Sequence, residues 1–352
     1  MIRRVAKRLI RPVADQLPHR RRRKARNAAR GIRPDVALPF DMFEEVQSAR
    51  DLKKAAKLAG IYHKGQHKIW DGKTVLPELI AKHGGINLPS EKVEAIQALF
   101  AVILWGELAA WKISADLALQ LEPLEAKLAA TSQAHDEARH FYTMYDYLSE
   151  LGDVPTQLGP HTQRLLEGVI NADTLTKKLV GMQMMVEPMA ITLFQLVREQ
   201  QVEPVLCDLL TLYERDEARH VALGVLHLPK LLTDMGHREA MDLWAWEFIE
   251  YWEQVEMLRE MEPHFKALGI PIRRVVDLGR QKQVRANRMM FEELGYDLKL
   301  FDAYMRLLDA RCSWLFPEFS DPGDVRGRAA EAWSKITAER EVVPDALSNV
   351  AA

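Results

Sequence analysis

The pentapeptide Asp-Glu-Ala-Arg-His occurs at residues 136–140 and again at residues 216–220 of this 352-residue chain. The two copies begin 80 residues apart. A lone glutamate, Glu107 or Glu187, lies 30 residues before the glutamate of each copy. Such matched spacing indicates that a pair of helices has been duplicated within the chain.

The spacing inside each half predicts where the side chains point. Glu137 and His140 are three residues apart, so on a helix both leave the same face. A separation of 30 residues lets an antiparallel helix place Glu107 beside Glu137 after a turn near Pro123. The second half repeats this arrangement around a turn near Pro204. The pattern therefore predicts four long helices whose acids and imidazoles meet at one height.

The two lone glutamates lie in apolar surroundings, Glu107 within AVILWGELAAW and Glu187 within LVGMQMMVEPMA. An unpaired buried carboxylate is costly, and four at one level of a bundle would repel one another. Two divalent cations balance their charge, and two imidazoles complete a ligand set that suits iron or manganese. The predicted metal ligands are Glu107, Glu137, His140, Glu187, Glu217 and His220.

The remainder of the chain reads as helix after helix from residue 90 onward, separated by Pro and Gly. The expected helices span residues 90–120, 123–151, 171–200, 203–233, 237–267, 271–294 and 298–315. Alternating β-branched runs are nearly absent, so the chain is predicted to be all-α. We expect a short helix near residues 42–58, irregular structure up to residue 84, and a loosely attached tail from residue 317.

The first 35 residues form a basic arm with 13 Lys and Arg residues and two acids, whereas the remainder has 35 basic and 48 acidic residues. Residues 1–13 place apolar side chains at helical spacing among arginines and lysines, which suits a helix on an anionic membrane surface. A solvated tail is an equally good interpretation. Nucleic-acid binding is disfavoured because no aromatic residues interleave the arginines.

Cysteine content and hydropathy bear on the compartment. Cys207 and Cys312 form neither a CxxC pair nor a disulfide framework, which fits a reduced cytoplasmic setting and ordinary core positions. No stretch of about 18 apolar residues is free of charge, so no membrane-spanning helix is expected. The N-terminus lacks the apolar run of a secretory signal.

The six-residue constellation resembles that of the ferritin-like di-iron carboxylate proteins. This family includes bacterial monooxygenase hydroxylases, acyl-carrier-protein desaturases, ribonucleotide reductase small subunits, demethoxyubiquinone hydroxylases and ferritins. The resemblance implies a ferritin-like four-helix bundle over residues 90–235. The basic arm at 1–35 and an N-terminal extension at 36–89 would precede it, and accessory helices at 236–316 and a tail at 317–352 would follow it.

The resemblance also implies a role for each side chain. Glu107 and His140 would bind one iron ion, Glu187 and His220 would bind the other, and Glu137 and Glu217 would bridge the two. Asp136 and Asp216 lie four residues before a ligand histidine and would accept hydrogen bonds from histidine N–H groups. Arg139 and Arg219 are expected to pair with these aspartates, a solvent-facing position being the alternative.

Other residues near the ligands are further candidates. Glu214 shares the face of Glu217 and is a candidate for an additional group beside the metals. Trp111, Phe194 and Tyr213 are candidate substrate contacts, with ordinary core packing as the alternative. Pro188 is expected to remove a backbone hydrogen bond and distort the helix that carries Glu187.

The resemblance implies two iron ions (Fe2+/Fe3+), or a manganese and iron pair, with O2 as co-substrate. We expect an oxidoreductase, of oxygenase, hydroxylase or desaturase type, acting on a hydrophobic small molecule, lipid or acyl chain. A radical-generating reductase subunit is disfavoured because Met144 stands four residues after His140, where the radical tyrosine commonly lies. The length and the helices after residue 235 disfavour a storage ferritin.

Two other functions stay open. One is a ferritin-like protein that oxidises iron or scavenges peroxide without oxidising an organic substrate. The other is a quinone or lipid hydroxylase that works at the membrane surface through residues 1–35. If the protein is an oxygenase, whether or not it works at a membrane, an external reductase or ferredoxin would supply the electrons, since no flavin, Rossmann or iron–sulfur motif is present. A homodimer also remains open.

Overall fold

The computed structural model describes residues 56–122, 124–233, 235–321 and 323–337. The basic arm, the part of the 42–58 helix that precedes residue 56 and the last part of the tail lie outside these ranges. Every regular element within the described ranges is helical, in agreement with the all-α prediction.

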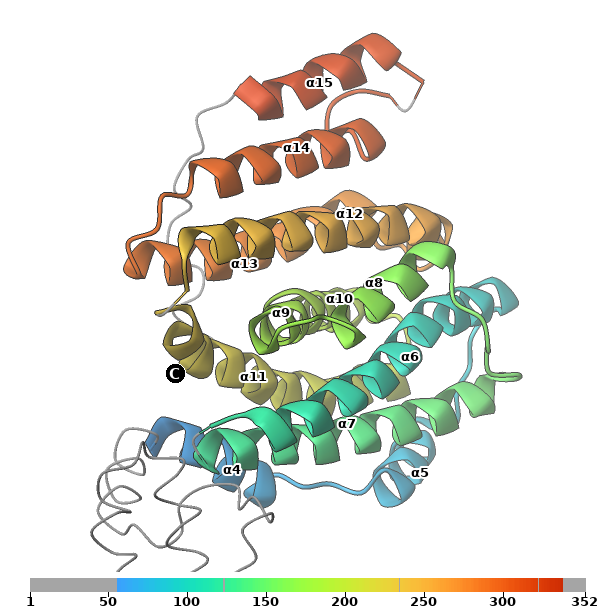
Figure 1. Cartoon of the computed structure of the whole chain (residues 1–352). Coiled ribbons are helices and arrows are strands. Elements are labelled where there is room, and N and C mark those ends of the chain that lie inside the picture. The colour runs from blue at the N-terminus through green and yellow to red at the C-terminus, as the bar shows by residue number, and fades with distance from the viewer. Residues whose placement is uncertain (1–55, 123, 234, 322, 338–352) are drawn as a thin grey trace, which may run out of the picture.

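Two helix pairs form the central bundle (Figure 1). The first pair comprises α6 (Ser90–Gln120) and α7 (Leu124–Leu151). The second pair joins a rod made of α9 (Leu175–Leu179), η1 (Val180–Val186) and α10 (Glu187–Glu199) to α11 (Pro204–Leu232). α7 packs on α11 between the pairs. The chain therefore has the ferritin-like four-helix fold.

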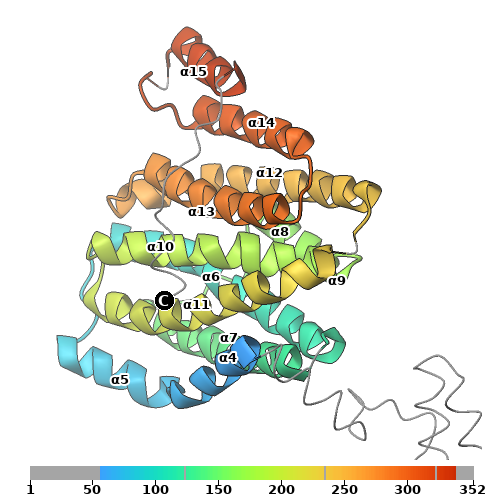
Figure 2. The ribbon, with the colours of Figure 1, turned by 90° about the vertical axis from the view of Figure 1, so that its left-hand side faces the viewer.

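The remaining helices cover two opposite sides of the bundle, as Figures 1 and 2 show. α4 (Ala56–His67) and α5 (Gly72–His83) pack on α7 and α11. α8 (Pro160–Ile170) and α12 (His237–Ala267) pack on α6, and α13 (Ile272–Glu293) packs on α10. α14 (Lys299–Leu315) lies on α12, and α15 (Val325–Thr337) lies on α14.

Four helices fall wholly or mostly where the sequence did not predict them. Residues 59–84 were expected to be irregular, but they form most of α4 and all of α5, where Asp71 caps the start of α5 and Gly84 (φ 71°) ends it. α8 was not expected at all. α15 lies in the predicted loose tail and packs on α14, although none of its residues is buried.

The rod that carries Glu187 is distorted beside Pro188, as expected. Residues Val180–Val186 form a π-helix, and the Glu187 N–H bonds to the Met182 carbonyl, five residues back. Pro188 has no N–H to donate, so the α-helical ladder cannot continue unchanged through this turn. The wide turn therefore ends directly at one of the predicted ligands.

Two helices are long and apolar enough to cross a membrane by length and composition alone, which does not contradict the sequence expectation. They are Ser90–Gln120 and Leu175–Glu199, and 56% and 78% of their most apolar windows are buried within the protein. Both are core helices of the bundle and contribute to its two hydrophobic clusters. Packing against neighbouring helices accounts for their apolar composition.

Candidate metal centre

The fold brings all six predicted ligands together at the centre of the bundle. One group of ligand atoms comes from Glu107, Glu137, His140 and Glu217, and a second from Glu137, Glu187, Glu217 and His220. Within each group the atoms lie within 4.8 Å of one another. Each of the six residues is at most 6% exposed. Two glutamates belong to both groups, which is the arrangement that two neighbouring metal ions require.

Both imidazoles turn the same nitrogen toward the carboxylates. His140 Nδ1 lies 3.0 Å from Glu217 Oε1 and 3.5 Å from Glu107 Oε2. His220 Nδ1 lies 3.0 Å from Glu137 Oε1. The Nδ1 atoms are therefore the ones placed to bind metal, and the Nε2 atoms face away.

The aspartates of the two pentapeptides hold the outer nitrogens in a crossed arrangement. His140 Nε2 lies 3.4 Å from Asp216 Oδ2, and His220 Nε2 lies 3.4 Å from Asp136 Oδ2. Each aspartate thus serves the histidine of the other copy, not the one four residues ahead of it. A carboxylate acceptor at Nε2 fixes the proton there and leaves Nδ1 free for a metal.

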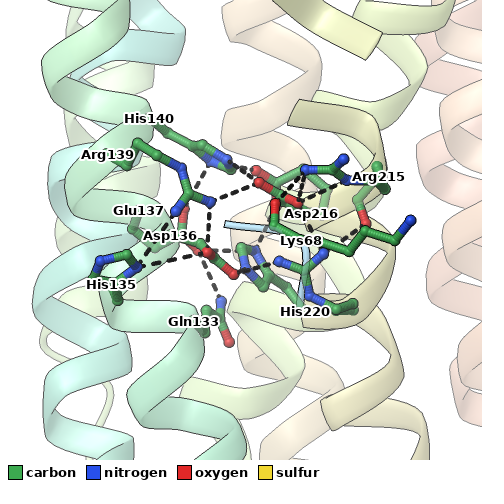
Figure 3. A network of polar contacts seen from close by, with 12 residues as sticks. Lys68, Gln133, His135, Asp136, Glu137, Arg139, His140, Arg215, Asp216 and His220 are labelled. Carbon is green, nitrogen blue, oxygen red and sulfur yellow. Dashed lines mark hydrogen bonds and ion pairs between the residues drawn. The ribbon is translucent and has the colours of Figure 1, made fainter. Parts of the chain in front are cut away.

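Two arginines, Arg139 (labelled in Figure 3) and Arg219, complete this network by bridging both aspartates. Arg139 donates to Asp136 at 2.6 Å and to Asp216 at 2.7 Å. Arg219 donates to Asp216 at 2.8 Å and to Asp136 at 2.7 Å. Burial raises the pKa of Asp136, but the hydrogen bond to His220 and the charge of Arg219 outweigh it and lower that pKa to about 2. Burial likewise raises the pKa of Asp216, but the hydrogen bond to His140 and the charges of His140 and Arg219 outweigh it and lower that pKa, so both aspartates stay ionised.

Trp70 is a member of this network that the sequence did not reveal. Its Nε1 donates to Asp216 Oδ2 at 2.8 Å, and the Arg139 guanidinium lies over its ring, 4.7 Å from the centroid. Trp70 precedes α5, in the extension outside the duplicated segment, and no spacing rule links it to residue 216. Only the packing of α4 and α5 on the bundle places it there.

Gln133 was also missed, although helical spacing could have found it. It lies four residues before Glu137, and its Nε2 donates to Glu137 Oε1 at 3.0 Å and to Glu187 Oε1 at 2.9 Å. The equivalent position of the second copy is Tyr213, whose ring stacks on His140 with centroids 4.1 Å apart. Its hydroxyl donates to the His140 carbonyl at 2.6 Å. The two halves of the site therefore differ at this position.

The ligand set is electrostatically incomplete without cations. Glu137 Oε2, His140 Nδ1 and Glu217 Oε1 are buried, and none has a hydrogen-bond partner among the described residues. Burial raises the pKa of Glu107 and of Glu187 well above the ordinary range. Orphaned buried acceptors of this kind are costly unless an ion satisfies them. The donor set thus fits two divalent metal ions.

Of the predicted substrate contacts and the additional acid, only Tyr213 touches a ligand, through its stacking on His140. Glu214 is outside both ligand groups and pairs with Arg198. Trp111 is 42% exposed. Phe194 is buried and meets the Tyr213 ring edge-on, with centroids 5.9 Å apart. None of these residues lines the cavity described next.

A narrow cavity of about 80 Å³ reaches the ligands from one side. Glu107, Glu187 and Glu217 lie on its wall. The rest of the lining is almost entirely apolar, with Thr162 and Gln254 as the other polar residues. The apolar lining comprises Leu99, Val102, Ile103, Gly106, Ala110, Leu165, Leu166, Met182, Val186, Met189, Ala190, Leu193, Met257, Leu258, Met261, Phe265 and Val275.

No protein-family model matches this chain, and no curated protein matches it. Among solved structures, an R2-like ligand-binding oxidase with aerobically reconstituted Mn/Fe cofactor is 20% identical, with a TM-score of 0.45 over 76% of this chain and 94% of that chain. Another R2-like ligand-binding oxidase, with its metal cofactor after photoconversion, is 18% identical, with a TM-score of 0.42 over 79% and 98%. Both likenesses concern the backbone and are partial.

Proposed function

We propose that this chain is an O2-activating, non-haem di-iron oxidoreductase that oxidises a hydrophobic small molecule, a lipid or an acyl chain. The apolar cavity that ends at Glu107, Glu187 and Glu217 carries this proposal. A substrate in the cavity would lie directly against the metal ligands. Iron storage would instead favour a polar route for a hydrated ion, and these walls offer few groups that could replace its water.

The six ligands form two overlapping groups, one for each ion. Glu107 and His140 would hold one, Glu187 and His220 the other, and Glu137 and Glu217, which belong to both groups, would bridge. Two reduced iron ions in this set would supply electrons for the reduction of O2, so that a bound substrate is hydroxylated, desaturated or N-oxidised. A manganese and iron pair would suit the same donors.

The residues around the ligands fix their geometry. Asp136 and Asp216 hold each imidazole with Nε2 outward, so that Nδ1 keeps its aim at the carboxylates. Gln133 donates to Glu137 and Glu187 and ties a bridging ligand to a terminal one. Hydrophobic clusters lie on both sides of the site and keep water from the substrate.

Electron supply and location belong to the same proposal. An external reductase or ferredoxin would deliver the electrons. We propose a cytoplasmic location, because Cys207 and Cys312 are buried, free thiols, and thiols stay reduced in that compartment. Contact of residues 1–35 with a membrane surface remains a prediction, which vesicle binding with and without those residues would test.

Isotopically labelled O2 tests the proposed chemistry. Iron-loaded protein would be reduced anaerobically and then exposed to the label with a panel of hydrophobic compounds. Label in an organic product, or a desaturated product without label, is the expected result, and the Glu217→Ala variant should form neither. Consumption of O2 or peroxide with no change in any organic compound would contradict the proposal and favour the iron-oxidising or peroxide-scavenging alternative.

A further inference from the structure

Gln254 is a polar residue on the cavity wall that belongs to neither copy of the duplicated pair. It lies on α12, is 2% exposed, and lines the cavity together with Glu187 and Glu217. A buried amide on an otherwise apolar wall is costly unless its donors and acceptors are used. Its hydrogen bonds therefore indicate what the cavity is built to hold.

The orientation of the Gln254 amide is fixed from behind by Gln283 of α13. Gln283 Nε2 donates to the Met185 carbonyl in η1 at 2.8 Å and to Gln254 Oε1 at 2.9 Å. A backbone carbonyl can only accept, so the Gln283 nitrogen must face Met185, and Gln254 must turn its oxygen to Gln283. The one hydrogen bond of the Gln254 side chain among the described residues is thus made by its oxygen, which leaves its nitrogen available as a donor.

The charges of the cavity wall restrict the ligand further. No lysine, arginine or histidine of the described chain lines it, and its acidic residues are three of the predicted metal ligands. Two divalent ions would balance the four carboxylates of the site. A charged group in this space that does not bind the metal ions themselves would therefore lack a counter-charge, at a high cost in desolvation. A neutral ligand avoids that cost.

The shape of the cavity gives the ligand a polar end and an apolar end. Along α6 the lining extends from Ala110 to Leu99, roughly 16 Å at the rise of an α-helix. Gln254 and Glu187 lie near the metal end. Leu99, Leu193 and Phe265 lie roughly 9–16 Å further along the same helical segments and belong to one hydrophobic cluster, so they form the apolar end.

We propose that Gln254 is a ligand-binding residue that selects a neutral, elongated apolar substrate carrying an oxygen acceptor, such as an alcohol, a ketone or an ester. The Gln254 N–H donates to that oxygen, and the apolar body of the substrate extends toward Phe265. Thr162 Oγ1, which is buried on the same wall without a partner among the described residues, offers a second polar contact. The inference rests on the proposed function, because it names the substrate class of the same site.

A matched ligand series tests this selection without turnover. Iron-loaded, full-length protein would be kept reduced and free of oxygen, and binding of octanol, octane, octanoate and octylamine would be followed by the rise in thermal midpoint. We expect octanol to bind about tenfold more tightly than octane, the effect of one hydrogen bond, and both charged compounds to bind more weakly than octanol. Tighter binding of octanoate or octylamine would overturn the proposal.

Two variants assign the effect to Gln254. Gln254→Met keeps the shape without the donor, and Gln254→Glu keeps the acceptor for Gln283 but replaces the donor with oxygen. Both should lose the preference for octanol while still binding octane, whereas Gln200→Met, at an exposed glutamine, should behave as wild type. An unchanged preference in Gln254→Met would overturn the assignment.

The wild-type ligand ranking decides the substrate class even if a variant fails to fold. Failure of the ranking leaves the proposed function standing, because no oxygen chemistry is measured. If the protein prefers octanol as predicted but oxidises no organic compound with O2, the proposed function is wrong, whereas the ligand preference assigned to Gln254 still stands.

Discussion

The two halves of the bundle carry the same ligands on different backbones. α6 runs unbroken through Glu107 for 31 residues, whereas the rod that carries Glu187 passes from α9 through the π-helix η1 into α10. Both halves nonetheless place a glutamate at the same centre. The two glutamates therefore occupy matching positions at the centre although the helices that carry them are built differently.

The surroundings of the two halves differ as well. At equivalent positions Gln133 donates to two carboxylates, whereas Tyr213 stacks on an imidazole. Trp70 contacts Asp216 and has no counterpart of the same kind at Asp136 among the described side chains. The two metal positions are therefore inequivalent. Variants can separate the effect of a ligand common to both positions from the effect of a residue that contacts only one half.

The largest expected effect comes from removing a ligand that both halves share. Glu217→Ala should lose both metal ions, because Glu217 belongs to both ligand groups. Glu107→Ala and Glu187→Ala should each lose mainly one ion. Elemental analysis of the metal bound per chain gives the measurement. Equal losses in all three variants would show that the halves do not divide the ions as described.

A buried carboxylate outside both halves is neutralised in a different way from the acids of the metal centre. Glu247 of α12 is 0% exposed, neither of its oxygens has a partner among the described residues, and burial raises its pKa to about 8. It is therefore neutralised by a proton, whereas the acids of the metal centre would be neutralised by cations.

The folded state keeps the Glu247 proton between the ordinary pKa of 4.5 and about 8, where the unfolded chain has lost it. Stability should therefore fall as pH rises through this window, by about 1.4 kcal/mol per pH unit from this group. Glu247→Gln should remove that part of the slope in chemical denaturation measured across the window. Parallel curves for wild type and variant would contradict the burial argument.

The contact between α11 and η1 gives a smaller effect that is specific to the second half. A Cβ on Gly224 would lie 2.5 Å from Gln183 Cβ and 3.0 Å from Met184 Cε. Gly224→Ala should therefore lower the free energy of unfolding by about 1–3 kcal/mol through overpacking. The first half has Met144 at the equivalent position and has no such restriction.

Gly60→Ala is the matched control for that experiment. Gly60 lies inside α4 with open space around its would-be Cβ, so alanine should stabilise the helix by about 0.5–1 kcal/mol. If both alanine variants stabilise the protein, α11 does not approach η1 as closely as described.

The smallest effect is expected at Tyr213. Tyr213→Phe removes one hydrogen bond to the His140 carbonyl but keeps the stacked ring, so it should cost about 1 kcal/mol in unfolding free energy. Both metal ions should still bind. A loss of metal in this variant would mean that the tyrosine, and not the ligand set alone, determines occupancy of the first half.

The long helices were predictable because Pro and Gly mark their ends. Pro204 begins α11, and the expected bounds of the seven long helical segments fall within a few residues of those observed. α5 and α8 were missed because each is only 11 or 12 residues long, and so short a segment is hard to assign from its pattern alone. The distortion before Glu187 followed from Pro188, although its form as a π-helix did not.

The six metal-site residues were identifiable from spacing, but their partners were only partly so. Helical spacing placed Asp136 on the face of His140, whereas the structure pairs it with His220 across the bundle. Which of two facing histidines an aspartate reaches depends on how α7 packs on α11, and no local pattern encodes that. Gln254 lies on a helix outside the repeat, so spacing gave no reason to connect it with the site.

Metal stoichiometry is the most direct test of whether the six residues bind two ions. Full-length protein produced with ample iron should bind two iron ions per chain, and their spectra should show a magnetically coupled pair, because Glu137 and Glu217 belong to both ligand groups. Protein that binds no iron, or a single uncoupled ion that Glu217→Ala retains, would contradict the account.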